Sequence, residues 1–443
     1  METVLLYILG ILIVVVGLAL SIGLHEVGHL VPAKLFGVRV GQYMIGFGPT
    51  LFSKRFGETE YGFKAIPMGG YISMAGMYPP ARAGGAAREA STGFFQTLVQ
   101  DARDTSAASI DAGHEERVFY KLPVFKRVII MLGGPIMNLL IGLVLYAVLL
   151  CGFGIAQSST TLGSVNACVI PAGSTQTECA TTDEAAPGAA AGLKPGDTIV
   201  SVEGTAISTW EQATAIIRES PGEPLDFVVE RDGATLDLVA TPLLTERYVY
   251  DSDGIEVLED ANGDPVTEKV GFLGIGSATE VVQQPITAVV PAVWDNITRV
   301  GHIILNLPQR LIDVANAAFG PGERDPNGPI SVVGIGRLAG EITSLNTIPI
   351  VDKAASLVGL LASLNVALFV FNLIPLMPLD GGHVAGALFD GIRRFFAKLF
   401  RRPDPGPVDI AKLIPLTMIV VILLGGMSAL LIYADIVKPI SIL

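Results

Sequence analysis

Three residues with the spacing of a metal site stand at the end of the first apolar segment of the chain. His25, Glu26 and His29 form the pattern H-E-x-x-H. On a helix, side chains four positions apart share one face, so both imidazoles can bind one metal ion. Zinc suits such ligands, and a catalytic zinc keeps one position for a water whose pKa it lowers to about 7. The pattern predicts a hydrolytic Zn2+ site in which Glu26 accepts the proton of that water; the alternative is a pair of hydrogen-bonded surface histidines.

Two histidines leave a catalytic zinc site one protein ligand short. The segment FNLIPLMPLDGGHVAGALFDG offers Asp380, at the end of an apolar run that Pro375 and Pro378 should break or kink. A carboxylate binds zinc strongly, so we expect Asp380 to be the third ligand. His383, three positions further on, is a rival ligand.

Four apolar segments are long enough to span a membrane, since the hydrocarbon core takes roughly 20 apolar residues. They cover residues 3–24, 128–154, 354–379 and 413–434. The first has an acidic rather than a basic start, so we expect a retained helix and not a cleaved leader. Ionisable groups inside a bilayer are costly, which favours a functional interpretation of the histidine pair.

Charge predicts the orientation of these spans. Residues 155–353 carry 27 acidic and 10 basic side chains, a net charge of −17 in a chain whose total is −13. Basic residues instead flank the second and fourth spans, at Lys126, Arg127 and between positions 393 and 412. By the positive-inside rule we expect the active site to face the cytoplasm, and both termini and the acidic loop to lie outside the membrane. The acidity argues against nucleic acid as a partner and is typical of a solvated domain surface.

The segments between the spans differ in pattern. Alternating apolar residues and glycines over 38–78 predict short strands at the membrane, which are tolerated there only when buried in protein or lining a wet cavity. Within the acidic loop, strands are predicted at 198–202 and 225–229 and a helix at 210–218, followed by amphipathic helices up to residue 353. Cys168 and Cys179 fall in this loop, where an oxidising compartment permits either a disulfide or two free thiols.

In the second apolar segment, GGPIMN places two small residues and an amide inside an apolar run. Gly133 and Gly134 permit close helix contact, and an intramembrane Asn138 requires a hydrogen-bond partner. This motif is either functional or a packing device alone.

Several motifs occur together in one order. HEVGH, GFGP, IPMGGY, GGPIMN and NLIPLMPLDGG surround a loop in which AGLKPGD and VEGTAI resemble a PDZ domain. The whole set resembles the site-2 protease family of intramembrane zinc metalloproteases (M50-type), in its bacterial RseP-like branch with a single PDZ domain. The cysteine pair before AAAGLKPGD is similar to actinobacterial members.

This resemblance implies a fold, a set of site residues and a substrate class. The fold is a polytopic α-helical membrane protein with four transmembrane helices, a membrane-associated β-hairpin or sheet region, and an inserted extracytoplasmic α+β PDZ domain. The substrates are single-span membrane proteins already shortened by an upstream protease, such as anti-sigma factors, cut inside the lipid bilayer. The implied residues are zinc ligands His25, His29 and Asp380, catalytic base Glu26, and substrate-binding Asn372, Gly69, Gly70 and Tyr71.

Other functions remain open at this point. The same chemistry would serve to clear remnant signal peptides. A non-catalytic PDZ scaffold is disfavoured because all three ligands and Glu26 are present, and a metal transporter because there is only one ligand cluster. The predicted regions are, in order, the first helix with HExxH (1–37), the membrane sheet with its re-entrant hairpin (38–78), a cytoplasmic loop (79–127), the second helix (128–154), the PDZ domain (158–280), the amphipathic region (281–353), the third helix (354–391), a basic cytoplasmic loop (392–412) and the fourth helix (413–435).

Overall fold

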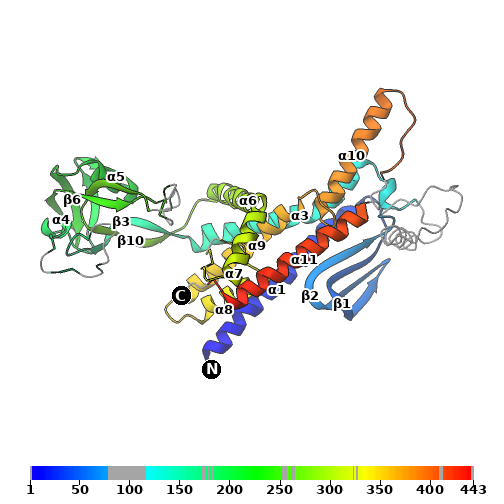
Figure 1. The fold of residues 1–443 in the computed structure, drawn as a ribbon, viewed down its shortest axis with the longest axis horizontal. Coiled ribbons are helices and arrows are strands. Elements are labelled where there is room, and N and C mark those ends of the chain that lie inside the picture. The colour runs from blue at the N-terminus through cyan, green and yellow to red at the C-terminus, as the bar shows by residue number, and fades with distance from the viewer. Residues whose placement is uncertain are drawn as a thin grey trace. The chain divides into compact units, whose positions relative to one another are not determined.

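The computed structural model describes residues 2–77, 116–170, 183–250, 265–322, 328–408 and 413–440, with a few single residues between these ranges. Most of the loop predicted over 79–127 lies outside the described residues. The chain forms two compact units, and Figure 1 shows the helices and strands of each. The first unit comprises Met1–Phe153 with Gln284–Leu443, and the second comprises Gly154–Gln283.

In the described residues of the first unit, four helices are long and apolar enough to cross a membrane. They are α1 (Glu2–Leu35), α3 (Val124–Ala147) with its π-helical continuation η2 (Val148–Phe153), α9 (Ile350–Asn372) and α11 (Ile414–Val437). Large apolar side chains stand exposed along these helices. Such exposure is stable in lipid, where backbone groups are satisfied within each helix and the surface meets hydrocarbon. Each of these spans overlaps one of the four apolar segments of the sequence.

The third span is shorter than predicted. We expected an apolar helix over 354–379 that Pro375 and Pro378 break or kink, within a third-helix region of 354–391. In the structure α9 ends at Asn372 and a separate helix, α10 (Asp380–Leu399), follows. Pro375 and Pro378 lack the backbone N–H that a continuous helix needs, so residues 373–379 form turns. Residues 392–399, at the beginning of the basic loop predicted over 392–412, belong to helix α10.

Strands β1 (Val40–Phe56) and β2 (Thr59–Met74) form an antiparallel sheet beside α1. Residues 42–45 of β1 pair with residues 60–63 of β2 on one side and with residues 70–73 on the other. The backbone of β1 bends at Gly46 and Gly48, which both have positive φ, so its second half pairs with β2 again. Within the described chain, residues 70–73 therefore form an edge of this sheet.

The described residues of the first unit also include the helices α6 (Val289–Leu305), α7 (Leu307–Phe319) and α8 (Val332–Ser344). Helix α8 packs on α1, and α7 packs on α11. The side chains of Arg324 and Asp435 are buried and form an ion pair that ties the end of α11 to the segment before α8.

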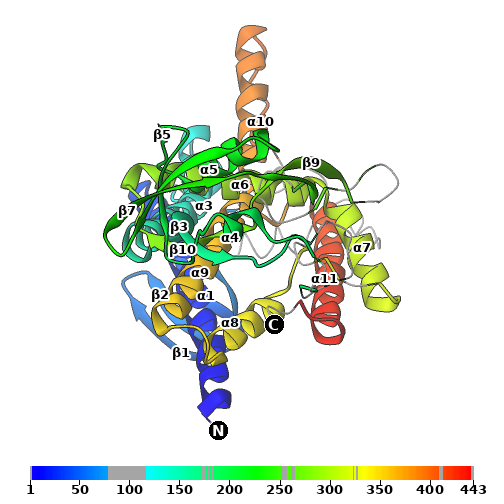
Figure 2. The ribbon, with the colours of Figure 1, turned by 90° about the vertical axis from the view of Figure 1, so that its left-hand side faces the viewer.

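In its described residues the second unit contains a six-stranded sheet, a separate two-stranded ribbon and the amphipathic helix α5, several of which are labelled in Figure 2. Its core includes Leu162, Ile199, Phe227 and Leu273. The predicted strands and helix fall within its elements, and Cys168 and Cys179 are joined by a disulfide bond. The sheet order is β10-β3-β4-β6-β7, with β5 beside β4 and a separate β8-β9 ribbon. The elements are β3 (Ile155–Val165), α4 (Pro187–Ala190), β4 (Thr198–Val202), β5 (Thr205–Ala206), α5 (Trp210–Glu219), β6 (Leu225–Arg231), β7 (Ala234–Ala240), β8 (Leu243–Tyr248), β9 (Thr267–Phe272) and β10 (Ile275–Val282); the short turns η1 (Phe119–Lys121) and η3 (Ile286–Ala288) belong to the first unit.

Candidate active site

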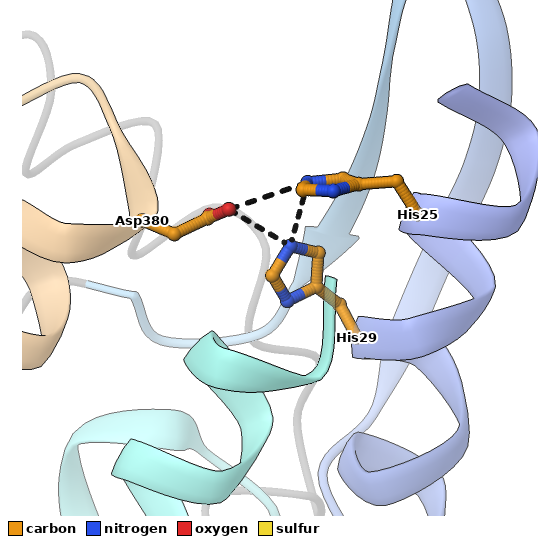
Figure 3. A group of neighbouring side chains, drawn as sticks. All are labelled: His25, His29 and Asp380. Atoms are coloured by element: carbon orange, nitrogen blue, oxygen red, sulfur yellow. Dashed lines mark hydrogen bonds and ion pairs between the residues drawn. The ribbon is translucent and has the colours of Figure 1, made fainter. Parts of the chain in front are cut away.

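Two helices that are far apart in sequence bring three polar side chains to one point. His25 and His29 project from one face of α1, and Asp380 is the first residue of α10 (Figure 3). The carboxylate oxygen Oδ2 of Asp380 lies 3.2 Å from His25 Nε2 and 3.3 Å from His29 Nε2. The two Nε2 atoms are 3.2 Å apart. The three candidate ligand atoms thus form a nearly equilateral triangle.

The size of this triangle fits zinc. Ligands about 2.0 Å from a tetrahedral ion are about 3.3 Å from one another. The triangle has this edge length and leaves a fourth tetrahedral position without a protein ligand. No other group of three or more His, Cys, Asp or Glu residues in the described ranges could hold a metal ion, and His383 is not part of this one. The donor set and its spacing therefore suit a catalytic zinc rather than a closed structural site.

The turns before α10 hold Asp380 in place. A Cβ atom at Gly381 would lie 2.3 Å from the carbonyl oxygen of Ile374, and one at Gly382 would lie 2.7 Å from the backbone nitrogen of Met377. Only glycine tolerates such an approach, so the first turn of α10 packs directly on the backbone that follows α9. The pair of glycines after Asp380 therefore has a packing role that fixes the third candidate ligand.

Helix α3 crosses α1 at the histidines. A Cβ at Gly133 would lie 2.0 Å from the carbonyl oxygen of Gly28, so the two backbones are in contact there. A Cβ at Gly134 would lie 2.3 Å from His29 Nε2 and 2.7 Å from His25 Nε2. The glycine pair of GGPIMN is thus part of the wall of the site. The sequence indicated close helix contact at this pair but gave no sign that the opposing element would be the HExxH helix.

Glu26 lies beside the cluster and against the edge of the β-sheet. It is 9% exposed and close enough to both histidines and Asp380 to interact with their charges. A Cβ at Gly70 would lie 3.0 Å from Glu26 Cγ, so the edge strand passes directly next to this carboxylate. A buried carboxylate beside a metal site is in position to act as a general base.

The other residues predicted to bind substrate lie around the same region. Gly69 has a φ of +109°, and a Cβ there would collide with the ring of Phe47. Tyr71 follows on the edge strand, and its hydroxyl donates a hydrogen bond to Gln42 Oε1 at 3.1 Å. Asn372 is the half-buried last residue of α9, where the helix gives way to the turns before Asp380. The structure places Gly70 next to Glu26, and Tyr71 and Asn372 outside the ligand triangle.

Comparison with known proteins adds an independent result. Residues 13–401 match the family model described as peptidase family M50. The zinc metalloprotease Rip1 of Mycobacterium tuberculosis is 33% identical over 447 residues, covering 99% of each chain. Rip1 of Mycolicibacterium smegmatis is 32% identical with 98% of each chain covered, and the metalloprotease MmpA of Caulobacter vibrioides is 28% identical with 87% of this chain and 88% of its own covered.

Proposed function

The chain belongs to peptidase family M50, the site-2 protease family, and is a multi-pass membrane zinc metalloprotease; from this premise we propose that it cuts a peptide bond inside the membrane-spanning segment of single-span proteins that another protease has already shortened. The predicted resemblance to this family and the zinc requirement are confirmed. The observation that carries the proposal is the triangle of His25, His29 and Asp380, with Glu26 between it and an open sheet edge. Anti-sigma factors are the substrate class that we propose.

The chemistry assigns a role to each residue of the site. His25, His29 and Asp380 hold the metal, and when bound zinc supplies the positive charge that activates a water and polarises a carbonyl. Glu26 accepts the proton of the attacking water and delivers it to the leaving amide nitrogen. Its burial in the first unit, away from bulk solvent, favours transfer between these two partners only.

Substrate binding uses the edge strand. A transmembrane helix hides its carbonyl groups in its own hydrogen bonds, so the segment to be cut must unwind locally. Among the described residues no strand pairs with the outer side of residues 70–73, so the backbone groups of this edge can pair with such an unwound segment. Because Gly70 has no side chain, a paired segment would lie close to Glu26. We assign Gly69, Gly70 and Tyr71 to this strand and Asn372 to a hydrogen bond with the substrate backbone.

The second unit supplies selection outside the membrane. We interpret it as a PDZ domain on the basis of its sheet, of α5, and of a groove of about 650 Å³ between α5 and the start of β10. Strand β10 stands at the edge of the sheet, which permits pairing with an extended peptide. With the acidic loop outside, this groove would admit substrates whose external part has been shortened. Residues that line it include Trp210, Ile217, Arg218, Phe272, Gly274 and Ile275.

The test is a comparison of two substrates in proteoliposomes. One is a single-span protein with its full external domain, and the other is the same protein truncated outside the membrane. We expect rapid cleavage of the truncated form only, with mass spectrometry placing the cut inside the apolar segment. Equal rates for the two forms would refute selection by size, and a cut outside the apolar segment would refute intramembrane cleavage.

A further inference from the structure

A buried amide on α3 lies against the first histidine of the site. Asn138 is 1% exposed, and its side-chain nitrogen is 3.1 Å from His25 Nδ1. This is the ring nitrogen opposite to Nε2, which faces Asp380. The other end of the amide, Oδ1, is buried and has no hydrogen-bond partner in this orientation.

The two ends of an amide are nearly identical in shape, so its orientation follows from the hydrogen bonds that it can make. If Asn138 donates to Nδ1, the imidazole carries its own proton on Nε2 and cannot bind a metal there. If the amide is turned by half a rotation, Oδ1 accepts from Nδ1–H and Nε2 is free to bind, while the amide NH2 takes the buried place in which Oδ1 has no partner. Metal binding through His25 Nε2 therefore selects the second orientation.

The second histidine has a matching arrangement. His29 Nδ1 lies 2.7 Å from the backbone carbonyl oxygen of Ile130, which can only accept a hydrogen bond. This bond places the proton of His29 on Nδ1 and leaves Nε2 free. Helix α3 thus contacts the outer nitrogen of both imidazoles, through a backbone carbonyl in one case and a side chain in the other. Partners of this kind fix the tautomer and the ring orientation of metal-binding histidines.

We propose that Asn138 is a positioning residue of the metal site, whose Oδ1 accepts a hydrogen bond from His25 Nδ1–H and so holds His25 ready to bind zinc through Nε2. This inference rests on the proposed metal site. It assigns the Asn of GGPIMN a role beyond helix packing.

The test measures zinc affinity of the full-length protein in detergent by competition with a chelator, without substrate. We expect Asn138→Ala to bind zinc about 10–100-fold more weakly, the range found when such partners of metal ligands are removed. Asn138→Asp keeps an oxygen acceptor in the same place, so its affinity should stay within about threefold of the wild type. Comparing the two variants shows whether zinc affinity depends on the hydrogen-bond acceptor, which Asp retains, or on the amide group, which both variants lack.

The matched control is Asn365→Ala. Asn365 is equally buried, lies on α9, and donates to Ser21 Oγ and to the carbonyl of Leu361 rather than to a histidine. Its replacement should leave zinc affinity unchanged. An unchanged affinity in Asn138→Ala, an equal loss in Asn365→Ala, or a loss in Asn138→Asp as large as that in Asn138→Ala would each overturn the assignment. Failure of the wild type to bind zinc would instead refute the metal site itself.

Discussion

The contact between α3 and the histidines makes Gly134→Ala the most informative single substitution. The added Cβ would stand 2.3 Å from His29 Nε2 and 2.7 Å from His25 Nε2, where ordinary contacts are 3.4–4 Å. The added Cβ would therefore stand about 1 Å too close to the two imidazole rings. Either α1 and α3 separate, which breaks the backbone contact between Gly28 and Gly133 one residue away, or the imidazoles turn out of the way. Both responses displace the Nε2 atoms that would bind the metal.

A shift of this size is large for a metal site, whose ligand distances are defined to about 0.2 Å. Misplacement by about 1 Å costs about 100-fold in catalytic rate. We therefore expect Gly134→Ala to lose at least about 100-fold in peptidase activity and a comparable factor in zinc affinity, although alanine is the better helix former. Chelator competition and cleavage of a model substrate measure the two quantities on the same preparation.

The control for this substitution is Gly425→Ala in α11, where a Cβ would meet no atom within 4 Å. It makes the same chemical change in another membrane helix and should keep wild-type zinc affinity and activity. Full zinc loading and full activity in Gly134→Ala would refute the geometry of the crossing between α1 and α3.

Three further predictions concern the second unit and are measured by urea unfolding followed by tryptophan fluorescence. Replacing Cys168 and Cys179 together by Ser should cost about 3 kcal/mol, the loop-closure value for a separation of 11 residues, and reduction of the wild type should reproduce it. Phe227→Ala, at a fully buried position, should cost about 3–5 kcal/mol while zinc affinity stays unchanged, because the metal site lies in the other unit. The hydrogen bonds from Arg231 hold the pKa of Asp197 below its usual range. This pair therefore stabilises the fold above about pH 4, and the stabilisation is lost as the pH falls through the lowered pKa. Asp197→Asn should remove that part of the acid dependence of stability, and an unaltered pH profile would contradict the pairing.

The candidate site was predictable where its signal is local in sequence. The H-E-x-x-H spacing places His25 and His29 on one helix face whatever surrounds them, and DGG after an apolar run indicated Asp380. Alternation of apolar residues likewise predicted the strands at 198–202 and 225–229. These patterns depend on the period of one element, which the sequence carries by itself.

Contacts between elements were not predictable in the same way. No periodicity shows that Gly133 meets Gly28, or that the amide of Asn138 meets His25, because each depends on how two helices cross. The start of a new helix at Asp380 was also missed: the prolines indicated a break, but the packing of Gly381 on the preceding turns decides where the chain resumes.

The central claim is that Glu26 and the three candidate ligands form a zinc peptidase site that acts within the membrane. The most direct test is cleavage of a truncated single-span substrate in liposomes by the wild type and by Glu26→Gln, with zinc content measured on both. The account predicts a cut inside the apolar segment by the wild type, and no detectable cut by a folded variant with the same zinc content. Equal cleavage by the two proteins at equal zinc content would contradict it.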